Sequence, residues 1–440
     1  MRGAVAAGHP LTAGAGARVL AEGGNAVDAC VAAAFAAAVA EGPLTGPAGG
    51  GFLLVHQEGE TVVLDCFFAV PATRLGEMEE VLVDFADAST QSFHVGEGSV
   101  AVPGLLAGLE AAHRRFGSLS WAELVEPAVA LADEGVVRNE AQAFLHEILH
   151  AILMRSEGGA RVHGHPDRVV TTELAATLAR IRDEGAAAVA ALVPELAADL
   201  DAYRVVESRP LRAAVLGREV LTTPPPSRGG AIVLDALQSL AAGGETSQAA
   251  FARSIGEAYA RSEVAVGHGT THISVVDGLG TAAALSSTLG SGSGVFRGGT
   301  QLNNMLGELD VIGTGERPAG ARLPSMMTPT LVLEDGLPRL VLGSAGSVRL
   351  AGAITQVAWR VLDGEPVAEA IEAPRVHVDG SVVHVEGGWP ETDVPAAAEV
   401  VRWSGRNLFF GGVQAVERRS DGSLAAAGDP RRGGAGVVVG

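Results

Sequence analysis

The feature that most constrains this chain is an internal run, Gly269-Thr270-Thr271-His272-Ile273-Ser274-Val275-Val276-Asp277. A glycine precedes two threonines, and a strand pattern follows at once. The turn at 277–280 and a second apolar segment at 282–288 complete a predicted β-hairpin. Antiparallel pairing brings the two ends of a hairpin together, so the pattern places Thr270 near Thr288.

A threonine hydroxyl is a weak nucleophile unless a base accepts its proton, and the residue's own α-amine can be that base. A free α-amine has a pKa of about 7.7–8.0, so much of it is neutral near pH 7–8. Thr270 lacks such an amine until the peptide bond before it is cut. We therefore predict a precursor that cleaves itself between Gly269 and Thr270, giving a large subunit, 1–269, and a small subunit, 270–440, that stay associated. The alternative is an ordinary strand threonine, which strands favour.

The run at 269–277 resembles the start of the small subunit in the γ-glutamyltransferase family of N-terminal-nucleophile hydrolases. Further motifs follow in the order of that family, namely Gly23-Gly24-Asn25-Ala26-Val27-Asp28-Ala29, Gly46-Pro47-Ala48-Gly49-Gly50-Gly51-Phe52, Val102-Pro103-Gly104, Pro224-Pro225-Pro226-Ser227-Arg228-Gly229-Gly230, Leu302-Asn303-Asn304, Met327-Thr328-Pro329-Thr330 and Gly343-Ser344-Ala345-Gly346. The similarity spans residues 3 to about 390. It implies one intertwined α/β (α+β) domain, an αββα four-layer sandwich, and an autoprocessed amide hydrolase or acyltransferase.

The resemblance implies a catalytic role for four residues. Thr270 is the nucleophile, and Thr288 orients it. The backbone N–H groups of Gly346 and Ser347 form the oxyanion hole, where donors stabilise the developing negative charge. The family has a second glycine where this chain has Ser347, which still offers an N–H group. A packing threonine at 288 and a simple loop turn at 346–347 are the structural alternatives.

The implied substrate pocket departs from the family. Phe67 stands where γ-glutamyltransferases have the arginine that binds the substrate α-carboxylate, while Gly290 and Met326 replace an asparagine and a serine. Ser325 is retained, and Glu308 still fits the position of an acid that binds the α-ammonium. An unpaired buried carboxylate costs several kcal/mol. Glutathione or another γ-glutamyl amide is the family-default substrate, but we expect an altered preference that favours aromatic or apolar acyl groups.

The missing arginine leaves one question open at this stage. Arg74, Arg297 or Arg322 could replace it, and their sequence positions do not decide which. Met305 also stands where the family has glutamine or glutamate.

Composition excludes several classes of protein. All 31 basic residues are arginine, so the lysine of a Walker A loop or of a pyridoxal Schiff base is missing. The net charge of −20 argues against a nucleic-acid partner. The longest apolar run, 29–40, is too short to cross a membrane, and Cys30 and Cys66 do not make a disulfide framework. We expect a small-molecule amide as substrate and no cofactor.

The location follows from the first residues. The segment 2–16 has no continuous apolar stretch and does not look like a signal peptide. We therefore predict a cytoplasmic protein, with an exported form made from an upstream start codon as the alternative.

A rival motif points to zinc. His146-Glu147-Ile148-Leu149-His150 matches the H-E-x-x-H pattern of metallopeptidases, in which histidines four residues apart share a helix face. His163 and His165 lie nearby as further ligands. The segment is outside every motif above, so adventitious metal binding and a solvated helix face are the other interpretations. An inert scaffold with the same fold is a third hypothesis, motivated by the altered pocket. We predict no catalytic metal.

Local patterns also predict the elements themselves. Helices are expected at 11–22, 26–40, 105–116 and 121–134, and the segment 136–215 is expected to be mostly helical with a loop at 158–166. Strands are expected at 51–56, 61–65, 273–276, 282–288, 330–334, 339–342, 382–385 and 413–417.

Overall fold

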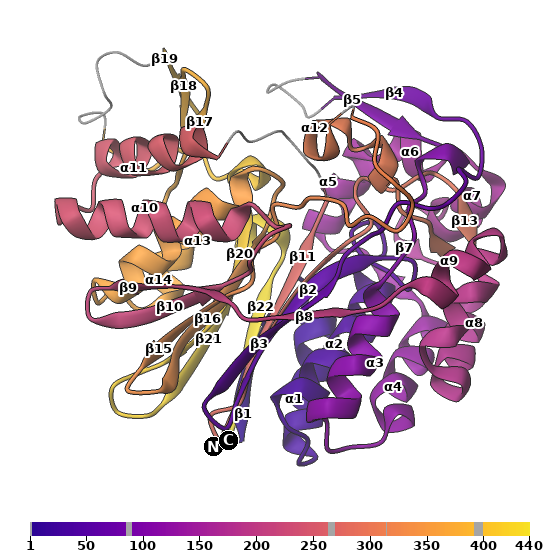
Figure 1. Cartoon of the computed structure of the whole chain (residues 1–440), viewed down its shortest axis with the longest axis horizontal. Coiled ribbons are helices and arrows are strands. Elements are labelled where there is room, and N and C mark those ends of the chain that lie inside the picture. Colours follow the sequence, from indigo (N-terminus) through magenta and orange to yellow (C-terminus); the bar gives the residue numbers. More distant parts are fainter. Residues whose placement is uncertain (1, 85–89, 263–268, 314, 391–398) are drawn as a thin grey trace.

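The computed structural model describes residues 2–84, 90–262, 269–313, 315–390 and 399–440. Two large β-sheets lie face to face at its centre, and helices cover the outer face of each sheet (Figure 1). The predicted αββα sandwich is confirmed.

The first sheet has seven strands, and every neighbouring pair in it is antiparallel. Its strands, in order across the sheet, are β22 (Ala435–Val439), β1 (Gly3–Ala7), β11 (Thr271–Asp277), β12 (Ala282–Thr288), β2 (Gly50–Gln57), β3 (Glu60–Cys66) and β8 (Val206–Ser208). The predicted hairpin is thus β11 and β12, and it lies between β1 and β2 at the centre of the sheet. The two ends of the chain pair with each other through β1 and β22 (Figure 1).

The second sheet has six strands. They are β21 (Leu424–Gly428), β20 (Gly412–Arg418), β16 (Leu337–Ala345), β15 (Thr330–Glu334), β10 (Arg218–Thr222) and β9 (Leu211–Val215). Small side chains of the first sheet face the second sheet. Along β1, Ala4 and Ala6 belong to the core between the two sheets, whereas Val5 and Ala7 belong to the core under the helices. This period of two is the alternation that a strand imposes on its side chains.

Two groups of helices close the outer faces. Against the first sheet lie α1 (Pro10–Ala21), α2 (Ala26–Ala40) and α3 (Leu105–Phe116), with α4 (Trp121–Glu134) and α8 (Thr172–Glu184) packed outside them. Against the second sheet lie α10 (Gly229–Gly243), α13 (Arg349–Leu362) and α14 (Val367–Glu372), with α11 (Gln248–Arg261) packed outside α10. The other elements are α5 (Glu140–Ile148), α6 (His150–Leu153), α7 (Glu157–His163), α9 (Ala197–Ala202), α12 (Leu309–Ile312), β4 (Glu79–Asp84), β5 (Thr90–Val95), β6 (Val136–Val137), β7 (Arg168–Val169), β13 (Phe296–Arg297), β14 (Thr300–Gln301), β17 (Val376–Asp379), β18 (Val382–Val385) and β19 (Glu399–Arg402).

Two of the sequence motifs meet at the start of the central helix α2. Its first turn is closed by a capping box between Asn25 and Asp28. The N–H of Ala26 also donates to the carboxylate of Asp277, at 3.1 Å. The same carboxylate accepts the N–H groups of Leu279 and Thr281, each at 2.9 Å, so it closes the hairpin turn and anchors α2 at once.

The seven-stranded sheet also explains the histidine of the central run. His272 is fully buried between the sheets, and its ring nitrogens lie 2.8 Å from Ser286 Oγ and 2.9 Å from Ser274 Oγ. A Cβ at Gly343 of the facing sheet would lie 2.3 Å from the ring, so only glycine fits there. Burial lowers the pKa of His272 to about 3.

Two predictions about local structure are wrong. The segment 136–215 is mostly helical, as expected, and it also contains the short strands β8 and β9. The loop expected at 158–166 is largely the helix α7. Helix α5 ends at Ile148 and α6 begins at His150, so the two histidines of the H-E-x-x-H motif do not share one continuous helix.

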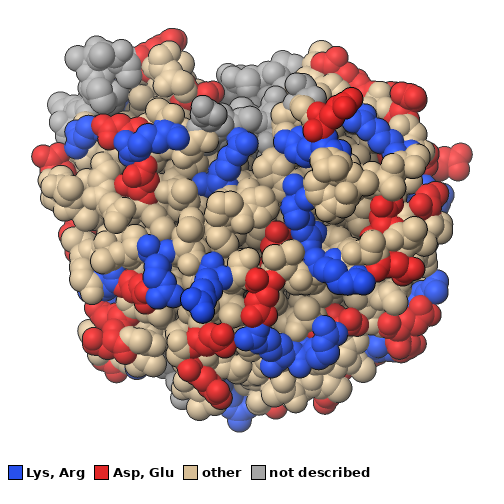
Figure 2. Space-filling model, viewed as in Figure 1, with Lys and Arg blue, Asp and Glu red and all other residues tan. Residues whose placement is uncertain are grey.

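The surface bears arginine and acidic side chains interspersed with uncharged residues on the face in Figure 2. Every helix in the described part of the chain is too short or too polar to cross a membrane. The cytoplasmic location stays a prediction.

Candidate active site

A small cavity of about 30 Å³ lies where the predicted site residues come together. Its walls come from both ends of the β11–β12 hairpin, from the segment after β3 and from the start of α13. The lining residues are Phe67, Thr270, Thr288, Met305, Glu308, Ser325, Met326, Met327, Ser347 and Leu350. Seven of the nine site residues expected from the sequence are among them. Of the other two, Gly346 directly precedes Ser347, and Gly290 lies against Glu308 and Met305 of the lining.

Thr270 and Thr288 stand at the two ends of the hairpin, and both are buried. The hydroxyl of Thr288 donates a hydrogen bond to the carbonyl oxygen of Gly269. The N–H of Gly290 donates to that same hydroxyl at 2.7 Å, which fixes its direction. A Cβ at Gly269, where φ is +63°, would lie 1.8 Å from the carbonyl oxygen of Gly290, so the close approach of the two segments requires glycine.

Gly346 and Ser347 form the turn between β16 and α13. Gly346 has a φ of +130° and Ser347 a φ of +63°, a conformation that non-glycine residues rarely adopt. The carbonyl oxygen of Gly346 accepts the backbone N–H of Arg349 at 3.1 Å and its Nε at 3.2 Å. Unfavourable backbone geometry held in place by its surroundings is typical of functional sites.

Glu308 is the single ionisable side chain among the ten described residues that line the cavity. Its Oε1 accepts the N–H of Ser291 at 2.9 Å and the hydroxyl of Ser291 at 3.0 Å. A Cβ at Gly290 would lie 2.2 Å from Asn304 Oδ1 and 3.0 Å from Glu308 Oε1. The glycine found in place of the family asparagine therefore leaves its space to Asn304 and Glu308.

The rest of the cavity is largely apolar. Phe67 is 1% exposed and stacks on Phe52 with ring centroids 5.4 Å apart. The rings of Phe67 and Phe68 pack edge to face, with their centroids 4.9 Å apart. Met305 and Met326 are 3% and 5% exposed and complete this side. The lining thus combines an apolar wall with the hydroxyl groups of the threonines and serines.

None of the three candidate arginines lines the cavity as the described residues form it. Arg322 lies behind Phe67, where its Nη1 donates to the Phe67 carbonyl at 2.8 Å and its guanidinium stacks on Tyr203 at 4.0 Å. Arg297 pairs with two glutamates, and Arg74 is exposed.

Several residues that position the site were missed by the sequence reasoning. Asn303 bonds the backbone of Ala101 and the carbonyl of Ala48, which joins its own motif to the glycine-rich turn at 46–52 and to the residue before Val102. The Ser227 hydroxyl donates to the Met327 carbonyl at 2.7 Å, so the proline-rich segment holds one wall of the cavity. Motif order alone signalled these residues, because their contacts are long-range.

The zinc hypothesis gains no support from this geometry. The rings of His146 and His150 have centroids 5.9 Å apart, and the break after Ile148 separates their helices. His146 lies instead against His163, at 5.4 Å. Across the described ranges, no cluster of three or more histidines, cysteines or acids is arranged to hold a metal ion.

Comparisons with known proteins agree with the fold. The model of the gamma-glutamyltranspeptidase family matches residues 12–258 and 245–439. The acylase ACY 1 proenzyme of Pseudomonas sp. (strain V22) is 31% identical, and the match covers 100% of this chain and 94% of the relative. The glutathione hydrolase proenzyme of Pseudomonas aeruginosa is 29% identical, with 99% and 94% covered. The crystal structure of cephalosporin acylase from Bacillus halodurans superposes with a TM-score of 0.81 at 21% identity, covering 99% of this chain and 95% of that one.

The four-layer sandwich with its central hairpin is the fold of the N-terminal-nucleophile hydrolases. The chain belongs to the gamma-glutamyltranspeptidase family. It is an enzyme of the hydrolase or transferase kind, so the inert scaffold is set aside.

Proposed function

We propose that this enzyme is a self-cleaving acylase that uses Thr270 as nucleophile and prefers an apolar or aromatic acyl group to γ-glutamyl. The carrying observation is the cavity at Thr270, in which Phe67, Met305 and Met326 surround the hydroxyl groups and no arginine is among the described lining residues. The names acylase and glutathione hydrolase both occur among its relatives, so the family includes more than one kind of substrate.

Self-cleavage would begin with attack of Thr270 Oγ on the carbonyl carbon of Gly269. The Thr288 hydroxyl already donates a hydrogen bond to the Gly269 carbonyl oxygen, which becomes negative during the attack, so it would stabilise that charge. The Thr270 nitrogen leaves as an amine, and an ester links Gly269 to Thr270 Oγ. Water then opens the ester, which leaves a carboxylate on Gly269 and a free α-amine on Thr270. The word proenzyme in the names of the relatives supports this route.

The subunits 1–269 and 270–440 would stay together after cleavage. Strands β11 and β12 of the small subunit lie between β1 and β2 of the large one, and β22 pairs with β1 on its other side. The bond between Gly269 and Thr270 precedes β11, so cutting it removes no strand pairing.

In the mature enzyme the α-amine of Thr270 would accept the proton of its own hydroxyl, and Oγ would attack the substrate amide carbon. The N–H groups at Gly346 and Ser347 would donate to the oxyanion. The amine of the substrate takes the proton and leaves. Water, or a second amine, then attacks the acyl ester and releases the acid or a new amide.

The acyl preference follows from charge and burial. A γ-glutamyl group carries an α-carboxylate, which needs a cation when it leaves water. Within the described lining the one ionisable group is Glu308, an acid, which would suit the α-ammonium of a γ-glutamyl group but offers its carboxylate no cation. An apolar acyl group instead gains by covering Phe67 and Met326, at roughly 25 cal/mol per Å² of apolar surface buried.

The test is a panel of p-nitroanilides offered to the processed protein. The acyl groups are γ-glutamyl, phenylacetyl and hexanoyl, and a denaturing gel with N-terminal sequencing first establishes whether threonine begins the smaller chain. We expect the two apolar anilides to be hydrolysed with the higher kcat/KM. A γ-glutamyl anilide turned over as well as they are would overturn the acyl preference, and an uncut active chain would overturn the nucleophile.

A further inference from the structure

A second cavity, of about 50 Å³, lies beside the residue that follows the proposed nucleophile. Glu41 forms part of its wall and accepts a hydrogen bond from the hydroxyl of Thr271. The apolar part of the wall comes from the end of α2, from α5 and from the segment before β20, with Val39, Leu145 and Leu408 among its residues. The cavity shares no lining residue with the one at Thr270.

Two arginines of this wall, Arg138 and Arg432, have hydrogen-bond donors that no protein group accepts. Arg138 uses its Nη atoms on backbone carbonyls, among them that of His163 at 2.6 Å, and its buried Nε has no hydrogen-bond partner. Arg432 donates to the Leu408 carbonyl at 3.3 Å, and its Nε is likewise unpartnered. Among the described residues, neither forms a salt bridge. Burial lowers the pKa of Arg432 to about 10, which still leaves it charged near pH 7.

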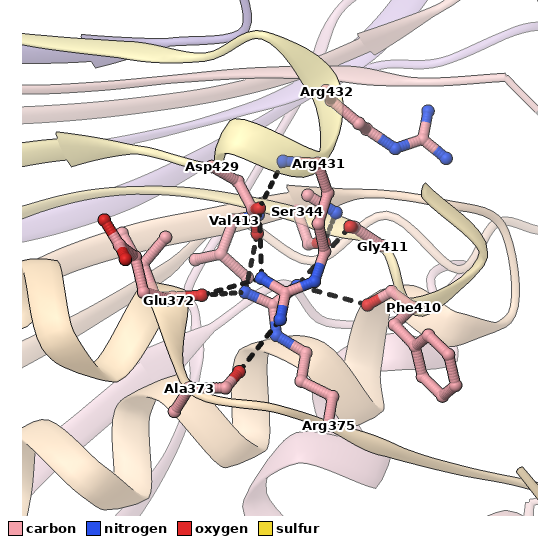
Figure 3. Close-up of polar contacts among 12 residues, drawn as sticks. Ser344, Glu372, Ala373, Arg375, Phe410, Gly411, Val413, Asp429, Arg431 and Arg432 are labelled. Carbon is pink, nitrogen blue, oxygen red and sulfur yellow. Dashed lines mark hydrogen bonds and ion pairs between the residues drawn. The ribbon is translucent and has the colours of Figure 1, made fainter. Parts of the chain in front are cut away.

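Arg431 shows the contrast. Its guanidinium bonds Glu386 at 2.6 Å and Asp429 at 3.2 Å. Figure 3 shows Arg431, Asp429 and Arg375 in one network. The side chain of Arg432 extends away from that network in the same view. Arg432 is half-buried and forms no salt bridge among the described residues, although the carboxylate of Asp429 attracts it from a distance. A charge removed from water gains from a direct partner, so Arg432 is the group in this region that a bound anion would satisfy.

The other polar groups of the cavity do not neutralise these charges. Glu41 is held by the hydroxyls of Thr12 and Thr271, and burial raises its pKa, which favours the uncharged acid. Burial lowers the pKa of His146 to about 4 and that of His163 to about 3, so both are neutral near pH 7. His146 Nε2 and His163 Nδ1 are buried without a partner, and His163 is 3% exposed.

We propose that this second cavity binds a short-chain carboxylate. The carboxylate would accept hydrogen bonds from the Arg138 and Arg432 side chains, and the hydrocarbon part would cover Leu145 and Leu408. The cavity volume of about 50 Å³ is well above the roughly 10–15 Å³ that a single water needs, so the cavity has room for a small organic acid.

The test follows trifluorobutyrate by fluorine NMR as it is titrated with the full-length protein, with trifluorobutylamine as the cationic control. We expect saturable binding of the acid and none of the amine. Leu145→Trp fills the second cavity and should abolish binding, whereas Met326→Trp fills the cavity at Thr270 and should leave it unchanged. Circular dichroism checks that each variant is folded.

A matched pair of single substitutions tests the polar residues in the wall of the second cavity. His146→Leu should weaken binding about tenfold, because it removes a nitrogen of the wall, while the exposed His150→Leu should have no effect. Arg432→Gln should also weaken binding, which keeps the test valid if a histidine variant fails to fold. The proposal is overturned if the wild type shows no saturable binding, if the amine binds as well as the acid, or if Leu145→Trp binds like the wild type.

Discussion

The hydroxyl of Thr288 donates a hydrogen bond to the carbonyl oxygen of Gly269, the residue directly before Thr270. These two residues are separated by the whole β11–β12 hairpin, and the hairpin register is what brings them together. In the mature enzyme the same hydroxyl would face the new terminus at Thr270. One threonine would thus assist cleavage first and orient the nucleophile afterwards.

Thr288→Val should slow self-cleavage by about tenfold or more, because valine keeps the shape and removes the donor on the Gly269 carbonyl. Thr288→Ser should cleave nearly as the wild type does. Thr45→Val serves as the control, since the Thr45 hydroxyl bonds Ser287 nearby and not the scissile carbonyl. The fraction cut is measured on gels over time after synthesis, and equal rates for Thr288→Val and wild type would contradict the role.

Phe67→Ala should lower the ratio of kcat/KM for the phenylacetyl over the γ-glutamyl anilide by about tenfold, because the apolar wall of the cavity is lost. Phe68→Ala is the matched control. Phe68 is equally buried but does not line the cavity, so both changes should cost about 3–5 kcal/mol of stability and only one should alter the ratio. The same ratio in both variants would mean that Phe67 acts through stability alone.

His146→Ala combined with His150→Ala should leave kcat/KM within a few-fold of the wild type, and a chelator should have the same small effect. The two histidines lie on separate helices and neither lines the cavity at Thr270. Activity is measured on the processed protein with a preferred anilide. Loss of activity in a folded, two-chain sample would return the metallopeptidase to consideration.

The rate should rise with pH through one group near neutrality, the α-amine of Thr270, because that amine must be neutral to accept a proton. Its pKa is expected at or below about 7.7–8.0, since a partly buried site disfavours the ammonium form. A kcat/KM profile of the processed enzyme gives the value. A profile that falls with increasing pH over this range would exclude the amine as the base.

Acid should destabilise the fold through His272. Its pKa is lowered to about 3 by burial, so in the range between that value and about 6.5 the unfolded chain binds a proton that the folded chain does not. Stability is therefore complete above about pH 6.5 and falls as the pH drops, by about 1.4 kcal/mol per pH unit for this residue. Urea unfolding of the uncut Thr270→Ala variant measures the slope, and His272→Gln should make it smaller. An unchanged slope would place the acid sensitivity at other buried histidines.

The sequence by itself determined the local elements with strong periodicity and the order of the motifs. Helices α2, α3 and α4 have the bounds that the pattern predicts, and the Asp277-Gly278 turn located the central hairpin. Turn chemistry and side-chain period act between near neighbours, so they are visible in a single chain. Antiparallel pairing then placed Thr270 beside Thr288 without further information.

Tertiary structure alone decided the contacts between distant segments. The pairing of β1 with β22, the strands β8 and β9 in an alanine-rich region, and the place of Arg322 behind Phe67 all depend on partners far away in the sequence. The helix break after Ile148 likewise separates His146 from His150, although their spacing of four residues predicted that they share one helix face. Strand formation and side-chain direction depend on the neighbouring sheet or helix, and packing overrides local preference where the two differ.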